Sequence, residues 1–227
     1  MKKVTILLMA LLCLCMQAEA KKEKVTRATQ YAKLYEERPQ AIVIMPPINK
    51  TQHVEAKDYF YSTMYIPLCD RGYYVFPPML TMEMFQTESA YDAEQFIEAD
   101  LNKFREVLGA DAAMFTIIKD WKRLNALGSI TVDVEYILRS TKTGETLYQR
   151  EGNISIDMRV KTNIGGLWGA LADLAATTVS TAATDKIVAG RQCTNYVLSN
   201  LPFGQYSPNY DKDRDYEAGS SVIAASL

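Results

Sequence analysis

Hydrophobic positions along the chain form three short continuous runs. They are Ala41 to Met45, Tyr73 to Phe76 and Ala112 to Ile118, and the first two end at the proline pairs Pro46-Pro47 and Pro77-Pro78. A continuous apolar run of this length, bounded by turn-forming residues, is typical of a strand that is buried on both faces of a sheet. The pattern therefore predicts three buried strands.

The segments between these runs have helical spacing instead. From Val54 to Leu68, apolar residues recur every four positions, and Gly72 suits the left-handed residue that follows a helix. Residues 80–85 and 101–108 are predicted as two further helices. The order strand, helix, strand, helix, strand implies parallel strands with helical crossovers.

The periodicity changes after the third run. Residues 131–138 alternate apolar and polar side chains, residues 141–145 resemble a turn, and residues 147–156 follow as a hairpin partner. The predicted fold class is therefore α/β, with a three-layer-like mixed sheet. In this sheet a parallel β-α-β-α-β start is extended by an antiparallel hairpin, and helices pack against it.

A last helix is predicted over residues 167–188, which are rich in Ala, Thr and Ser. Gly165 and Gly169 have the spacing of a close-packing motif of membrane helices. Asp173, Asp185 and the many hydroxyl side chains disfavour a bilayer. We expect the helix to pack on the sheet or on a partner subunit.

The N-terminus has the pattern of a secretory leader over residues 1–20. Lys2-Lys3 precede the apolar stretch Val4 to Met16, and Ala18-Glu19-Ala20 matches a signal-peptidase site. The mature chain is then expected to begin at Lys21. Cys13 and Cys15 are poor lipidation sites because each follows a leucine, so soluble export is favoured and a lipid anchor is the alternative.

The remaining 207 of the 227 residues are enough for one domain. We predict a charged tether over residues 21–39, a single α/β domain over 40–204 and a disordered tail over 205–227. The tail is rich in Pro, Gly, Ser and alternating charges.

Charge and cysteine content narrow the class of protein. The leader carries two Lys and one Glu, so the net charge of −2 becomes −3 after its removal. This balance gives no electrostatic footprint for nucleic acid. Cys69 and Cys193 could form a disulfide, although two separate thiols are the favoured interpretation.

Motifs of catalysis and cofactor binding are absent from the sequence. It has no glycine-rich phosphate loop and no Gly-x-Ser-x-Gly element, and its single histidine, His53, excludes a multi-histidine metal site. Paired carboxylates could support a hydrolase, but a solvated acidic face is the favoured reading. The acidic residues concerned are Glu83, Glu88, Asp92, Glu94, Glu98 and Asp100. No catalytic, cofactor-binding or metal-binding residue is assigned, and no cofactor is expected.

Tyrosines are the more informative residues, because tyrosine is enriched at protein interfaces. Tyr59, Tyr73 and Tyr74 lie around the first crossover. Asn49 and Pro77 follow the first two strands, at the end of the sheet where open α/β folds place their crevices. These five residues are our candidates for a protein interface or a ligand crevice.

Five stretches of the sequence together resemble a family of bacterial lipoproteins of unknown function, typified by a neisserial surface-antigen candidate. They are AIVIMPPINKT, PLCDRGYYVFPP, LGADAAMFTIIKDW, VEYILRSTKTGETLY and LPFGQYSPNY. The strand-Pro-x-x-Asn element also resembles the start of a TolB N-terminal-type domain.

The resemblance implies a non-catalytic α/β domain of the cell envelope, in the periplasm or on either face of the outer membrane. Family members are often encoded beside a homologue of the curli secretion channel. This implies an accessory role in assembly or secretion, with envelope proteins as partners, and a curli-channel-like component is one candidate. A homo-oligomer is expected, and contact with the membrane only through a lipid anchor. A small-ligand-binding periplasmic module and a carboxylate-dependent hydrolase are the alternatives.

Overall fold

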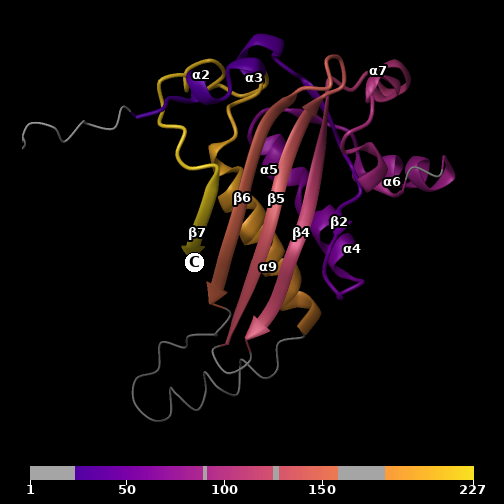
Figure 1. The fold of residues 1–227 in the computed structure, drawn as a ribbon, viewed down its shortest axis with the longest axis vertical. Helices are drawn as coiled ribbons and strands as arrows, with labels where there is room; N and C mark the ends of the chain where they lie inside the picture. Colours follow the sequence, from indigo (N-terminus) through magenta and orange to yellow (C-terminus); the bar gives the residue numbers. More distant parts are fainter. Residues whose placement is uncertain (1–23, 89–90, 125–127, 158–181) are drawn as a thin grey trace, which may run out of the picture.

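A computed structural model describes residues 24–88, 91–124, 128–157 and 182–227. In this part of the chain, one mixed sheet is packed between helices (Figure 1). The strand order is β3-β1-β4-β5-β6-β7, and the short β2 also pairs with β4. The predicted α/β class with a mixed sheet is confirmed.

The strands are β1 (Ala41–Ile44), β2 (Ile48–Asn49), β3 (Tyr74–Val75), β4 (Ala112–Leu124), β5 (Ser129–Ser140), β6 (Thr146–Asp157) and β7 (Val222–Ser226). The α-helices are α2 (Arg27–Gln30), α3 (Ala32–Glu37), α4 (Ala56–Thr63), α5 (Tyr65–Asp70), α6 (Pro78–Thr87), α7 (Asn102–Leu108) and α9 (Ala182–Val197). Two 3-10 helices are η1 (Ala93–Phe96) and η2 (Leu198–Asn200).

The first half of the sheet is parallel, as predicted. β1 lies between β3 and β4 and runs parallel to both, with Ile42 beside Val75 on one side and Ala112 on the other. The predicted helix over residues 54–68 is divided into α4 and α5. Gly72 has a φ of 84°, so it adopts the predicted left-handed conformation after α5.

The second half is an antiparallel meander of β4, β5 and β6. β4 continues to Leu124 rather than ending at Ile118, and a register shift between Ile118 and Asp120 lets it keep pairing with β5. Buried and partly exposed residues alternate along the whole of β5, as the period-two pattern predicts.

Each face of the sheet has its own hydrophobic core. On one face, α4 and α9 cover β4, β5 and β6, with Phe60, Met64 and Cys193 against Trp121 and Tyr136. On the other face, α6 and α7 cover only the β1–β4 part. The buried residues of this smaller core are Val43, Met45, Ile48, Phe85, Ala93, Leu101, Phe104, Ala110, Ala113 and Phe115.

The structure differs from the predicted tether over residues 21–39. The described residues form α2 and α3, and Tyr31, Leu34 and Tyr35 are buried in the larger core. Their i, i+3, i+4 spacing makes one apolar face, although charged neighbours make the segment resemble a linker.

The structure also differs from the predicted disordered tail over residues 205–227. The segment makes a series of turns and ends in β7, which pairs parallel to β6. Its apolar sequence from Val222 to Ala225 supplies the strand. Most of the predicted helix over 167–188 lies outside the described residues, and α9 contains its last part.

The segment that follows Pro46-Pro47 after β1 forms a turn held by local hydrogen bonds. Asn49 accepts hydrogen bonds from the backbone N–H and the hydroxyl of Thr51, at 3.0 and 2.8 Å, and donates to the His53 carbonyl at 2.7 Å. These bonds turn the chain from β2 towards α4.

Within the described ranges, no helix has the length and apolar character needed to cross a bilayer.

Candidate interaction surface

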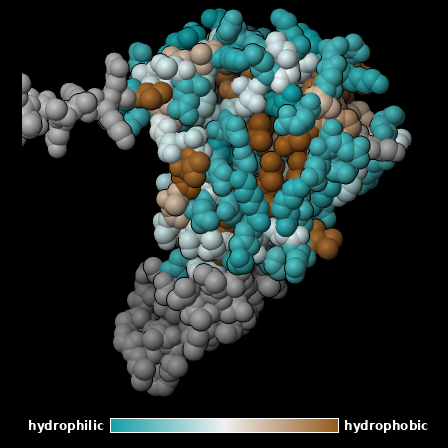
Figure 2. Space-filling model, viewed as in Figure 1, coloured by the Kyte–Doolittle hydropathy of each residue, from teal (hydrophilic) through white to brown (hydrophobic). Residues whose placement is uncertain are grey.

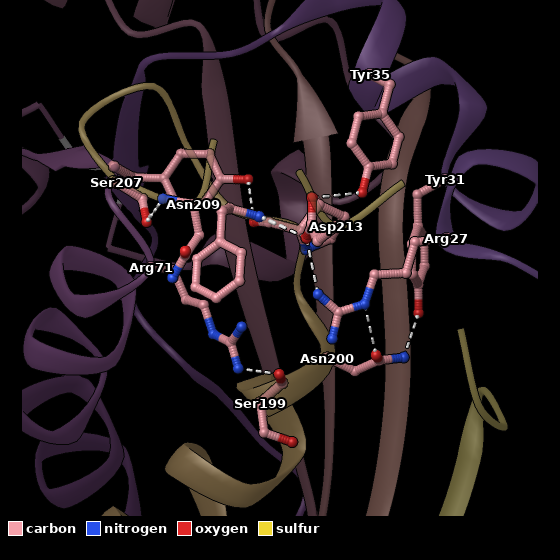
Figure 3. A network of polar contacts seen from close by, with 12 residues as sticks. Arg27, Tyr31, Tyr35, Arg71, Ser199, Asn200, Ser207, Asn209 and Asp213 are labelled. Carbon is pink, nitrogen blue, oxygen red and sulfur yellow. Dashed lines mark hydrogen bonds and ion pairs between the residues drawn. The ribbon is translucent and has the colours of Figure 1, made fainter. Parts of the chain in front are cut away.

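A buried polar network joins the two ends of the described chain (Figure 3). The Asp213 carboxylate accepts hydrogen bonds from Arg27 Nη1 at 2.7 Å, from the Tyr35 hydroxyl at 3.0 Å and from the Phe203 N–H at 3.1 Å. Burial, followed by the charge of Asp213, raises the pKa of Tyr35. Asp213 therefore holds α2, α3 and the C-terminal segment together.

Arg27 extends this network to η2. Its Nε donates to the Asn200 side-chain carbonyl at 3.0 Å, and the Asn200 amide donates to the Tyr31 hydroxyl at 3.3 Å. The neighbouring cavity, lined by Tyr35, Tyr210 and others, measures about 10 Å³, which is about the space of one water molecule. The network therefore has the character of a structural clamp rather than of a substrate site.

Two glycines bring the C-terminal segment against the start of β3. The Gly204 N–H donates to the Arg71 carbonyl at 2.8 Å, and the Tyr206 N–H donates to the Gly72 carbonyl at 3.0 Å. A Cβ on Gly72 would lie 2.4 Å from the Ser207 nitrogen, and one on Gly204 would lie 2.4 Å from the Gly72 oxygen. The two backbones can approach this closely only because both residues lack a side chain.

The six acidic residues of the hydrolase alternative do not form a facing pair. All of them are exposed. Asp92 and Asp100 accept bonds from the backbone N–H groups of Glu94 and Asn102, and Glu94 pairs with Lys50. Asp92 caps η1, and Asp100 binds the first N–H of α7. All six acids face solvent, which is the arrangement of a solvated acidic face.

The five candidate residues from the sequence are not brought together in one crevice. Tyr73 is buried, and its hydroxyl donates to the Pro202 carbonyl at 2.9 Å. The side chain of Asn49 is engaged in the corner described above, and Tyr59 packs edge-on against Trp121. Tyr74 and Pro77, in contrast, are both exposed.

Tyr74 and Pro77 belong to an apolar surface at the β3 edge of the sheet, which we call the β3-edge patch. It comprises Tyr65, Ile66, Tyr74, Phe76, Pro77, Met79 and Leu80. Met79 and Leu80 are 83% and 63% exposed, and Ile66 is 56% exposed. Exposed apolar residues scattered singly are ordinary, but a group on consecutive elements indicates an interaction site.

Local contacts fix the shape of the β3-edge patch. The rings of Tyr74 and Phe76 meet edge to face, with centroids 5.2 Å apart. α5, which carries Tyr65, packs against β3, which carries Tyr74. The charge of Cys69, followed by a hydrogen bond with it, raises the pKa of Tyr65. Tyr61 fixes the start of α6, because its hydroxyl donates to the Pro78 carbonyl at 3.0 Å.

Sequence reasoning does not identify Ile66, Met79 and Leu80 as members of the β3-edge patch. Hydrophobic residues near a helix start usually face the core, and only the orientation of α6 shows that this pair faces outward. The proline pair before Met79 is the one available signal, because it fixes the start of that helix.

The face of β5 and β6 that α9 does not cover carries mostly hydrophilic side chains (Figure 2). Lys119 Nζ lies 3.0 Å from Glu135 Oε2 and 2.7 Å from Glu151 Oε2, so one lysine forms ion pairs with two carboxylates. Asp133, which shares this face with Glu135, lies within 3.4 Å of the Asn153 amide. Such paired charges are ordinary on a solvated sheet.

The two described cysteines are free thiols. Cys193 is fully buried beneath the sheet, whereas Cys69 is partly exposed beside Tyr65. Burial raises the pKa of both thiols. The disulfide that the sequence allows is not formed in the structure.

Comparison with known proteins identifies relatives of the chain. It is 26% identical over 181 residues to Putative lipoprotein NMB1124/NMB1162 of Neisseria meningitidis serogroup B, covering 79% of this chain and 81% of the relative. The crystal structure of lipoprotein GNA1162 from N. meningitidis matches with 22% identity and a TM-score of 0.46, over 63% of this chain and 99% of that one. A PelC dodecamer from Paraburkholderia phytofirmans matches with 14% identity and a TM-score of 0.42, over 74% and 91%.

The model of one protein family, described as "Putative lipoprotein GNA1162-like", matches residues 29–202. This range begins within α2, ends just after η2 and includes Gly72. The chain therefore belongs to the GNA1162-like family.

Proposed function

We propose that the protein is a non-catalytic component of the cell envelope that helps to assemble or secrete envelope components. It does so by binding another envelope protein at the β3-edge patch. The observation that carries this proposal is the exposure of Tyr74, Met79 and Leu80 on one edge of an otherwise well-covered parallel half-sheet. A partner that covers these side chains removes apolar surface from water.

The composition of the β3-edge patch suits protein recognition. Aromatic residues and methionine are enriched at interfaces, while lysine and glutamate are depleted. The ring contact between Tyr74 and Phe76 and the Tyr61 bond to α6 hold the patch in place. Binding then loses little conformational entropy, which favours affinity.

The family supports the location of this function, because a lipoprotein family implies an exported, envelope-associated protein. The resemblance noted from the sequence suggests a curli-channel-like secretion component as the first partner to test. The proposal of a non-catalytic role is supported by the buried network around Asp213, because its carboxylate is bonded to Arg27 and Tyr35.

The test is site-specific photocrosslinking in intact cells of the native host. A photoreactive phenylalanine analogue replaces Tyr74 or Met79, and replaces Lys142 in the β5–β6 turn as a control that is also exposed. We expect crosslinks to one envelope protein from positions 74 and 79, identified by mass spectrometry, and none to that protein from position 142.

A matched variant tests the energetic role of the same residues. We expect Tyr74→Ser combined with Leu80→Ser to reduce copurification of the crosslinked partner by about tenfold or more, since such anchors dominate interfaces. The melting temperature should fall only slightly, because Tyr74 and Leu80 are 50% and 63% exposed and, among the described ring contacts, only that with Phe76 is lost. Equal crosslinking from all three positions, or full copurification by the variant, would refute the proposal.

A further inference from the structure

Strand β7 forms the second edge of the sheet, opposite β3. Figure 1 places it at the left border, and among the described residues no strand pairs with its outer side. Val222, Ala224 and Ser226 are exposed, while Ile223 and Ala225 are partly buried against the larger core. The strand carries no charge.

The backbone bonds of β7 show which of its groups point outward. Ser221 accepts from the Glu151 N–H at 2.8 Å, and Leu227 donates to the Ser155 carbonyl at 2.8 Å and accepts from the Asp157 N–H at 3.0 Å. In a parallel ladder, alternate residues bond the neighbouring strand. The N–H and C=O groups of Val222, Ala224 and Ser226 therefore face away from β6.

Natural sheet edges are usually protected by lysine, proline, a bulge or a covering loop. Residues 222–226 contain no lysine or proline, and their pairing with β6 has no register shift. An uncharged and regular edge of this kind is a template for a further strand.

We propose that β7 pairs with β7 of a second copy of this chain, antiparallel, about a two-fold axis at Ala224. In this register Ala224 faces Ala224 of the second copy, and Val222 faces Ser226 of the second copy. Every outward N–H and C=O of the three residues then meets a complementary group, because antiparallel partners exchange both bonds at such positions. The two sheets become one continuous sheet.

The arrangement of side chains favours a second copy over an unrelated strand. The residue at the axis is alanine, which is small enough to face itself without a clash. The β6 residues beside Val222 and Ser226 are Glu151 and Ser155. Because Val222 of one copy faces Ser226 of the other, antiparallel pairing places Glu151 of one copy on the same row as Ser155 of the other. The Glu151 carboxylates of the two copies therefore stay apart.

The surroundings of β7 add apolar area to this interface. Val222, Leu227 and Tyr196 are 62%, 42% and 40% exposed. Tyr196 and Leu227 also line a shallow, open part of the surface beside α9. Stable interfaces bury about 1,200–2,000 Å² in total. A short strand pair supplies only part of that area, so we expect a dimer that dissociates on dilution.

Placing a charge at the axis tests the proposal. The full chain is expressed with its leader, purified as the cell processes it, and studied in mild detergent by analytical ultracentrifugation over about a hundredfold range of concentration. Ala224→Lys and Ala224→Glu each place like charges face to face, and residue 224 is exposed in the monomer. We expect each variant alone to dimerise about tenfold more weakly or worse than the unaltered chain.

Mixing the two variants should restore dimers, because only a register with residue 224 opposite itself pairs the new lysine with the new glutamate. Ala224→Pro is a further variant that removes an outward N–H without removing a bond to β6, and it should also give monomers. Monomeric behaviour of the unaltered chain at all concentrations would overturn the proposal. Dimerisation of Ala224→Lys at normal strength, or failure of the mixture to re-form dimers, would do the same.

Discussion

Arg27 Nη1 donates to Asp213 Oδ2 at 2.7 Å across 186 positions of sequence. The two side chains are only 9% and 1% exposed. The pair connects a segment before the first strand to a segment after the last described helix, and both segments have the composition of linkers. This ion pair therefore explains why neither end of the described chain is a free tail.

Asp213→Asn should cost about 3–5 kcal/mol of unfolding free energy, because it leaves the buried Arg27 charge without a counterion. The measurement is urea denaturation followed by circular dichroism. Asp211→Asn is the control, since Asp211 pairs with Arg214 at the surface, where such pairs contribute about 1 kcal/mol or less. Equal losses for the two variants would contradict the role assigned to Asp213.

The hydrophobic periodicity of the sequence predicts the strands of the sheet, but it does not predict the buried network around Asp213. The runs at 41–45 and 112–118 predict β1 and β4 because buried parallel strands are continuously apolar. Asp213 lies in the sequence KDRDY, which resembles an exposed charged turn. Its burial depends on Arg27, Tyr35 and Phe203, and no local pattern indicates that such distant residues meet.

For a similar reason, only some of the candidate interaction residues are exposed. Tyr73 and Tyr74 are adjacent, so their side chains leave the strand in opposite directions, one into the core and one into solvent. Periodicity over so short a strand does not decide which is which. Asn49 is a candidate because of its predicted position after a strand, but its side chain forms a local turn.

Gly72→Ala should destabilise the fold by about 1–3 kcal/mol more than Gly109→Ala. Both glycines have left-handed φ angles, 84° and 73°, so both substitutions carry the same backbone penalty. A Cβ on Gly109 meets nothing within 4 Å, whereas one on Gly72 lies 2.4 Å from the Ser207 nitrogen. The difference, measured by urea denaturation of both variants, isolates the crossing of the C-terminal segment over β3. Equal destabilisation would show that the crossing tolerates a methyl group.

The two described thiols should react at different rates with a disulfide reagent such as Ellman's reagent. Burial raises the pKa of Cys193 and excludes the reagent from it, whereas Cys69 is only partly buried. Comparison of the Cys69→Ser and Cys193→Ser variants assigns each reaction. We expect Cys69 to react in the folded protein and Cys193 only in urea. Rapid labelling of Cys193 without denaturant would contradict its position beneath the sheet.

Stability should fall in strongly alkaline solution. Burial raises the pKa of Tyr61 to about 12 and raises the pKa of Tyr136 and Tyr148 as well. A tyrosine in the unfolded chain loses its proton near pH 10. The stability that the neutral hydroxyls contribute is therefore fully present below pH 10 and is lost as pH rises towards the folded pKa.

Each such tyrosine should reduce the unfolding free energy by roughly 1.4 kcal/mol per pH unit above about pH 10. Urea denaturation at a series of pH values measures this slope. Tyr61→Phe removes one titrating group and should make the slope between pH 10 and 12 shallower. Tyr206→Phe, which alters an exposed tyrosine, should leave it unchanged. A free energy of unfolding that stays constant through this range would mean that solvent reaches these hydroxyls, which contradicts their burial against the sheet.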